Sequence, residues 1–294
     1  MTYRFVVCLF ATALAAMGQT RKFADLLWVW GIPQGIAAYD IAAGKMLDTM
    51  EPSQFAQANA ISKAKILGVA NVAMAGNGLP NDLKEAERLS REVGGLKRVA
   101  WEFGPDKGEG PPFVYTQKVE ILSKLRAKHR HIEAVLIDDM LTSQRKQGLR
   151  AEHIATLRRQ LAASVPGIKM WGIVYTMNLK DPVLPGYLKL LDVVNLWTWH
   201  ADEIRNLDAN FAEAEKLAGG KPIVLGLYLY DYGKNRQIPR DLMQLQCEKA
   251  LALARQGRVQ GVIFLLVNNA ADTVVWTRDW IRRVADEPVP RQAP

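Results

Sequence analysis

The chain has 294 residues, of which 49% are hydrophobic and 23% are charged, so its composition excludes a disordered protein and allows one large α/β domain or two small ones. The formal net charge is +8, but the basic residues are spread along the chain. No recognised nucleic-acid-binding module or aromatic–basic pattern is present, and we therefore predict no nucleic-acid partner.

The first element in chain order is a predicted signal peptide over residues 1–18. A short basic start precedes residues 5–16, which are apolar but too short to span a bilayer, and small residues precede a cleavage site before Gln19. An uncleaved membrane anchor is the alternative. Cleavage removes Cys8 and leaves Cys247 alone, so no intrachain disulfide can form. We expect a secreted or periplasmic bacterial protein with no membrane span after cleavage.

Apolar, β-rich runs then alternate with amphipathic segments, which is typical of a parallel sheet covered by helices. The predicted strands cover residues 26–32, 69–75, 98–103, 134–138, 169–176, 193–199, 223–230 and 261–267. The predicted helices that follow them cover residues 52–67, 81–93, 115–128, 151–163, 184–191, 202–217, 240–256 and 272–284.

Eight strand–helix units predict an α/β fold, a (β/α)8 TIM barrel, as one domain over residues 19–286. An open doubly wound sheet is the competing fold. It would carry a glycine-rich phosphate turn after the first strand, and the segment GIPQG at that place does not match this fingerprint. Residues 287–294 are rich in proline, and we expect a disordered tail there.

Carboxylates at two strand ends are the first candidates for catalysis, because TIM barrels carry their active sites at the C-terminal ends of the strands. The fourth strand ends in Asp138 and Asp139, which are costly to bury without a task or a partner. Alternation through Leu136 favours Asp138 as the group at the barrel mouth, with Asp139 as a modulator or second acid. A helix cap or a loop salt bridge is the alternative. Glu102, at the end of the third strand, is a further acid–base candidate.

The seventh strand ends in YLYDYG, where Asp231 lies among three tyrosines. Tyrosine rings form sugar-stacking walls, and their hydroxyls can orient a carboxylate, so Asp231 is a catalytic candidate. If the tyrosines face inward, strict alternation turns Asp231 away, unless the strand has already ended. The alternative is aromatic packing with Asp231 in a turn.

Aromatic and polar residues at the other strand ends form the predicted substrate-binding set, since indole and phenol rings favour the CH-rich faces of pyranose rings. His200 is a base, a hydrogen-bond partner or a helix cap. Asn268 is either a hydrogen-bond partner of hydroxyls or a turn residue. The set comprises Trp28, Trp30, Trp101, Tyr175, Trp197, Trp199, His200, Tyr228, Tyr230 and Asn268.

The clustering of aromatic residues and carboxylates at the C-terminal ends of the predicted strands favours an oligo- or polysaccharide substrate. Glycoside hydrolysis usually requires two carboxylates, which Asp138 or Asp139 together with Asp231 or Glu102 can supply. Only His200 of the four histidines lies at a predicted strand end, and neither HExxH nor GxSxG is present, so we expect neither a metal nor a cofactor. We predict a carbohydrate-active enzyme, a glycoside hydrolase. A non-catalytic glycan-binding barrel and another TIM-barrel hydrolase are the alternatives.

With these residues in view, the chain resembles glycoside hydrolase-type barrels of exported bacterial proteins. The segments NLWTWHADEI, YLYDYGKNRQIPRDLMQLQC and GVIFLL…VVWTRDWI are similar to a largely uncharacterised family of such barrels. The resemblance covers strands four to eight well and the first half loosely. It implies the barrel fold and a carbohydrate setting.

Two segments, LDVVNLWTWH and AVLIDDM, are also similar to the sixth- and fourth-strand motifs of family 18 chitinases. The catalytic glutamate of that motif falls at Met140, and methionine cannot transfer a proton. The resemblance therefore does not imply chitinase chemistry in its usual form. The ending LIDD also resembles barrel glycosidases with an aspartate on strand four.

Overall fold

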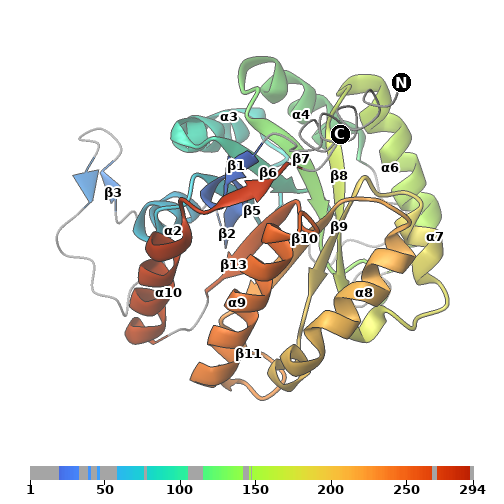
Figure 1. Cartoon of the computed structure of the whole chain (residues 1–294). Helices are drawn as coiled ribbons and strands as arrows, with labels where there is room; N and C mark the ends of the chain where they lie inside the picture. Colours follow the sequence, from blue (N-terminus) through green and yellow to red (C-terminus); the bar gives the residue numbers. More distant parts are fainter. Residues whose placement is uncertain are drawn as a thin grey trace, which may run out of the picture.

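Eight parallel strands close into a barrel in chain order, with helices packed around the outside (Figure 1). This computed structural model confirms the predicted TIM barrel. The predicted signal peptide and Asn268 lie outside the residues that the structure describes, which are 20–32, 39–40, 45–46, 58–75, 78–104, 115–141, 146, 148–266 and 270–291.

Each barrel strand falls within or close to a range that the apolar runs predict. The strands are β2 (Leu27–Gly31), β5 (Asn71–Met74), β6 (Arg98–Glu102), β7 (Ile132–Ile137), β8 (Lys169–Tyr175), β9 (Val193–Trp197), β10 (Ile223–Tyr228) and β13 (Gly261–Leu265). Neighbouring strands pair in parallel all the way round, and β13 pairs with β2 to close the ring.

The helices follow the strands as expected. They are α2 (Ala60–Leu67), α3 (Leu83–Glu92), α4 (Thr116–Lys128), α6 (Ala151–Ser164), α7 (Leu184–Leu188), α8 (Leu207–Ala218), α9 (Arg240–Arg255) and α10 (Ala271–Val284). A 3-10 helix, η5 (Ala201–Asn206), precedes α8. Among the described residues, we find no helix with the length and apolar character needed to cross a membrane.

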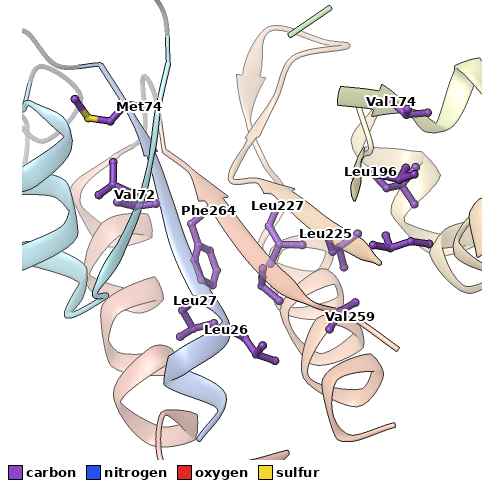
Figure 2. Packing of buried hydrophobic residues seen from close by; sticks show 14 of the residues in the cluster. Leu26, Leu27, Val72, Met74, Val174, Leu196, Leu225, Leu227, Val259 and Phe264 are labelled. Carbon is purple, nitrogen blue, oxygen red and sulfur yellow. The ribbon is translucent and has the colours of Figure 1, made fainter. Parts of the chain in front are cut away.

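Side chains that alternate along each strand build two separate apolar layers. On β7, Val135 and Ile137 point outward and pack with the helices, whereas Ala134 and Leu136 fill the barrel interior. Figure 2 shows part of the outer layer, in which side chains from neighbouring strands pack side by side. This alternation predicts which residue directly after each strand faces the barrel mouth.

The N-terminal end of the barrel is closed by the two ends of the described chain. Strand β14 (Pro288–Pro290) pairs antiparallel with β1 (Thr20–Lys22), so residues 288–290 are ordered and the predicted disordered tail is wrong there (Figure 1). Val289 is fully buried against the core. The proline-rich, polar composition led us to expect that the entropy cost of ordering this segment would exceed any gain. Burial of the Val289 side chain offsets that cost.

A polar group also lies at this end, inside the barrel. The Arg98 guanidinium packs 4.7 Å from the centre of the Trp28 ring, and its Nε donates to Asn71 Oδ1 at 3.2 Å. Trp28 in turn contacts Trp171 edge to face, with ring centres 5.0 Å apart. Trp28 therefore fills the barrel interior near its N-terminal end and not the mouth at the C-terminal end.

Candidate active site

A cavity of about 240 Å³ lies at the C-terminal end of the barrel. Its volume is below the roughly 300–1,000 Å³ of sites for drug-sized ligands, so it fits one small ring rather than a chain of them. Six of the lining residues are aromatic and two are acidic. The lining consists of Trp30, Asp138, Asp139, Ile173, Tyr175, Trp197, Trp199, Tyr228, Tyr232 and Leu265.

Asp138 follows β7 directly and takes the next inward position after Leu136, as alternation predicts. Burial raises the pKa of its carboxyl well above the usual value, and the negative charges of Asp139 and Glu102 raise it further. A hydrogen bond of 2.8 Å from the Asp139 backbone N–H to Asp138 Oδ1 opposes this shift. Asp138 consequently keeps its proton to higher pH than a free aspartate, which suits a general acid.

Asp139 also lines the cavity, although strict alternation would turn it away. Its backbone has a φ of 49°, in the left-handed region that few residues other than glycine adopt. This turn brings the second carboxylate to the cavity, where Asp139 Oδ1 accepts a hydrogen bond of 2.6 Å from the Tyr175 hydroxyl. Strained backbone of this kind concentrates at functional sites.

Tyr175 is the last residue of β8 and stays a donor to Asp139. Burial raises the pKa of the Tyr175 phenol, as does the nearby charge of Asp138. Burial likewise raises the pKa of Tyr228. Both phenols therefore remain neutral and can hold or pass a hydrogen bond at any physiological pH.

Met140 faces the opposite way. It is fully buried in the outer layer, where its side chain packs over Gly172 together with Leu191. A Cβ at position 172 would overlap the ends of both side chains, which would have to shift to make room for it. The position at which family 18 chitinases carry their catalytic glutamate thus belongs to the core in this chain.

One wall of the cavity is a cluster of four rings. Trp199 and Tyr232 lie 5.2 Å apart with their planes tilted by 34°. Trp199 also contacts Tyr175 and Tyr228 edge to face, at 5.5 and 5.9 Å between ring centres. Such contacts fix the ring orientations, because each ring packs against at least one other.

The rest of the aromatic lining comes from β2 and β9. Trp30 contacts Trp197 edge to face at 5.6 Å. The Trp197 indole lies directly over Gly226 of β10, where a Cβ would overlap the ring. Trp197 is only 1% exposed, so it forms the cavity floor rather than an open platform.

Asp231 does not line the cavity, and its predicted catalytic role is not supported by its position. Its side chain is 1% exposed and forms an ion pair with Arg236, with 3.2 Å between Oδ2 and Nε. Its Oδ1 accepts weak hydrogen bonds from the backbone N–H groups of Lys234 and Ala201, at 3.3 and 3.5 Å. Asp231 thus joins the hairpin of β11 (Tyr230–Asp231) and β12 (Arg236–Gln237) to η5.

Other residues of this hairpin support Tyr232. The Tyr230 hydroxyl donates to Asn235 Oδ1 at 2.9 Å, and the Tyr230 ring packs against Tyr232 at 5.3 Å. His200 is exposed and lies against Gly233, where a Cβ would overlap its imidazole. Tyr230 and His200 therefore hold the loops in place without lining the cavity.

Three further predicted residues lie elsewhere, and one is not described. Trp101 is fully buried in the outer layer and cannot reach a ligand in the cavity. Trp28 fills the barrel interior near its N-terminal end, as described above. Glu102, the last residue of β6, is half-buried near Asp138 and acts on it through charge, without lining the cavity. Asn268 lies outside the described residues.

Three lining residues were not predicted from the sequence: Tyr232, Ile173 and Leu265. Ile173 and Leu265 lie at inward strand positions, and alternation alone would have found them. Tyr232 lies beyond the strand, and only the hairpin brings it back over the cavity. Across the described ranges, no group of three or more His, Cys, Asp or Glu side chains is placed to hold a metal ion.

No protein-family model matches the chain, and no curated protein matches it. Solved structures with a similar fold do exist. A β-glucuronidase from Bacteroides uniformis has 12% identity and a TM-score of 0.52 over 84% of this chain, and the chain spans only 32% of that protein.

Two smaller proteins match along nearly their whole length. The GH99 endo-α-mannosidase from Bacteroides thetaiotaomicron has 12% identity and a TM-score of 0.52, covering 88% of this chain and 97% of that one. A family 18 chitinase from Crocus vernus has 11% identity and a TM-score of 0.50, with the same coverage. At these identities the likeness establishes the (β/α)8 barrel fold and nothing finer.

Proposed function

We propose that this protein is a glycoside hydrolase that cleaves an oligo- or polysaccharide in the cavity at the barrel mouth. One observation carries the proposal. Consecutive aspartates, one with a raised pKa and one held by a tyrosine hydroxyl, face a cavity walled by six aromatic rings. The names of the fold neighbours, an endo-α-mannosidase and a chitinase among them, support the same class of reaction.

The two aspartates take different roles in this proposal. Asp138 carries a proton and gives it to the glycosidic oxygen as the carbon–oxygen bond breaks, so the leaving sugar departs as an alcohol. Asp139 faces the anomeric carbon and stabilises its positive charge. A water then adds to that carbon, and its proton returns to the Asp138 carboxylate. This route retains the anomeric configuration. If Asp139 instead takes the proton of a water that adds from the opposite face, the configuration inverts, and the anomer of the product distinguishes the two routes.

The aromatic wall supplies the binding energy. Sugar rings present CH groups on their faces, and the rings of Trp199 and Tyr232 offer apolar surfaces of matching size. Tyr175 holds Asp139 in a single orientation, so the carboxylate is preorganised before substrate arrives.

We also propose that the protein is exported after removal of its signal peptide. N-terminal sequencing of the mature chain tests this, and a first residue of Gln19 would support it.

Mass spectrometry of a glycan mixture incubated with the purified protein tests the function. We expect shorter products with wild type and with the control variant Asp241→Asn, which alters an exposed ion pair on α9. Asp138→Asn and Asp139→Asn should give none while remaining folded. An oligosaccharide that is retained and never shortened would instead identify a glycan-binding barrel. Full activity in both active-site variants would overturn the proposed roles.

A further inference from the structure

Charge is distributed unevenly between the two ends of the barrel. The segments that lead into the strands, each through the first residue of its strand, lie at the same end as β1 and β14, and we call this end the N-terminal face (Figure 1). They carry ten Lys and Arg residues but four Asp and Glu residues, whereas the described segments that follow the strands carry more acidic than basic residues. The N-terminal face comprises residues 20–27, 68–71, 93–98, 129–132, 165–169, 189–193, 219–223, 256–261 and 285–291.

Each of the four acids on the N-terminal face is already paired with a cation. Two of these cations, Arg158 on α6 and Arg255 on α9, come from outside the face. Arg130, Lys169 and Lys189 are exposed, and none of them pairs with a described carboxylate. The face therefore keeps an excess of positive charge after pairing. The four pairs are Asp25–Lys97, Asp192–Arg158, Asp286–Lys22 and Glu287–Arg255.

Three guanidinium groups gather at one edge of this face. Arg21 on β1 is half-buried, and burial lowers the pKa of its guanidinium. The positive charges of Arg98 and Arg291 lower that pKa further, whereas Asp25 opposes the shift and is itself shared with Lys97. These cations therefore repel one another, and a surface of negative charge beside them would relieve the repulsion.

A hollow of about 230 Å³ lies within the same face, between the end of α6 and the start of β8. Apart from Arg158, Lys169 and Asp192, its lining residues are apolar, Leu161 and Ile168 among them. A soluble polyanion such as an acidic polysaccharide offers charge but little apolar surface, whereas the interface of a lipid bilayer offers both. The hollow therefore favours a bilayer over a soluble polyanion as the partner of this face.

We propose that the N-terminal face binds the surface of an anionic lipid bilayer, so that the protein attaches to it peripherally. Arg130, Lys169 and Lys189 contact lipid phosphates, and the hollow receives apolar groups of the interface. Because the cavity with Asp138 and Asp139 lies at the opposite end of the barrel, it faces away from the bilayer. This attachment does not depend on which reaction the cavity performs.

Co-sedimentation with lipid vesicles tests the proposal on the chain from Gln19 onward, which holds every described residue. Vesicles of phosphatidylcholine alone would be compared with vesicles that also contain phosphatidylglycerol, at about 50 mM and about 500 mM NaCl. Each basic residue at an anionic surface strengthens binding by about fivefold, so we expect binding to the anionic vesicles to be at least about 10²-fold stronger and to be lost at high salt. Equal binding to both kinds of vesicle would overturn the proposal.

Two charge-reversal variants locate the binding surface. Lys169→Glu combined with Lys189→Glu alters the N-terminal face and should lower vesicle affinity by about 30-fold or more. Arg150→Glu combined with Lys180→Glu makes the same change in net charge at the mouth and should lower vesicle affinity by less than about threefold. All four side chains are exposed, and thermal melting verifies that each variant folds. Equal losses would show attraction by net charge alone and would count against the N-terminal face.

Two further comparisons distinguish a bilayer from other anionic partners. Ala162→Glu places a carboxylate in the hollow, whereas Ala163→Glu places it on the next exposed residue of α6, outside the lining. We expect Ala162→Glu to weaken vesicle binding more than Ala163→Glu does, because only the first charge occupies the apolar hollow. Alginate, an acidic polysaccharide, should bind more weakly than vesicles of matched charge. Either equal weakening by the two variants or tighter binding to alginate would overturn the bilayer as the partner.

Discussion

Two aspartate sites at the barrel mouth look alike in sequence and differ in structure. Asp138 follows β7 and Asp231 follows β10, each after an apolar run with tyrosines nearby in the fold. Asp231 has an arginine partner and two backbone donors, whereas Asp138 has one backbone donor and two negative neighbours. A buried carboxylate with compensating partners holds loops together. One without them is kept at a cost to stability, which is typical of catalytic groups.

The largest expected effect is on activity at the uncompensated site. Asp138→Asn should lower the rate of glycoside hydrolysis by about 10²- to 10⁴-fold, because asparagine cannot donate the required proton. The same change should increase the free energy of unfolding at neutral pH by on the order of 1 kcal/mol, which would be measured as a higher thermal midpoint. The folded protein binds this proton more tightly than the unfolded chain, so wild type loses stability as the pH rises through the two pKa values. A variant that loses activity and stability together would contradict this prediction.

A smaller effect is expected at the hydrogen bond that orients Asp139. Tyr175→Phe should lower kcat by about tenfold, the value of one hydrogen bond to a charged group. Tyr230→Phe is the matched control in the other region, because it removes the hydroxyl that donates to Asn235 and lies outside the cavity. Steady-state kinetics of both variants on one substrate checks the pair. Equal losses would show that Tyr175 has no special role.

At the compensated site we expect lost stability and weaker binding rather than lost chemistry. Asp231→Ala should lower the free energy of unfolding by about 2 kcal/mol, since it removes an ion pair and two backbone contacts. KM should rise several-fold with kcat less affected, because the hairpin that presents Tyr232 loosens. Chemical denaturation and kinetics measure the two effects. A loss of kcat as large as that of Asp138→Asn would restore Asp231 as a catalytic candidate.

The smallest effect concerns the pH profile. Activity should fall as the pH rises through the pKa of Asp138, because the general acid then loses its proton. Glu102→Gln removes a negative neighbour, lowers that pKa and should move the alkaline limb to lower pH by about half a unit. Glu152→Gln, an exposed change on α6, should leave the limb in place. A shift to higher pH in Glu102→Gln would contradict the assignment of the acid.

Local sequence patterns predicted much of the fold. Within the candidate site, they predicted the residues that lie on regular strands. Periodicity of two along β7 places Leu136 and then Asp138 inward, and the structure agrees. The same rule fails at Asp139, because its left-handed backbone brings a second carboxylate to the same cavity. The prediction for Trp101 fails for the opposite reason. Its place near the end of β6 led us to expect contact with substrate, but alternation along the strand points its side chain outward into the core.

The apolar runs and their helical partners by themselves determined the eight-unit barrel and the end at which its carboxylates gather, because burial of alternate side chains depends on local order. Only the tertiary structure decided which of the carboxylates has a partner. Asp231 meets Arg236 and η5 through a hairpin, and Asp139 meets Tyr175 from a neighbouring strand 36 positions away. Contacts between separate segments depend on how the chain closes in space, and they distinguish an aspartate that joins loops from two that face a ligand cavity.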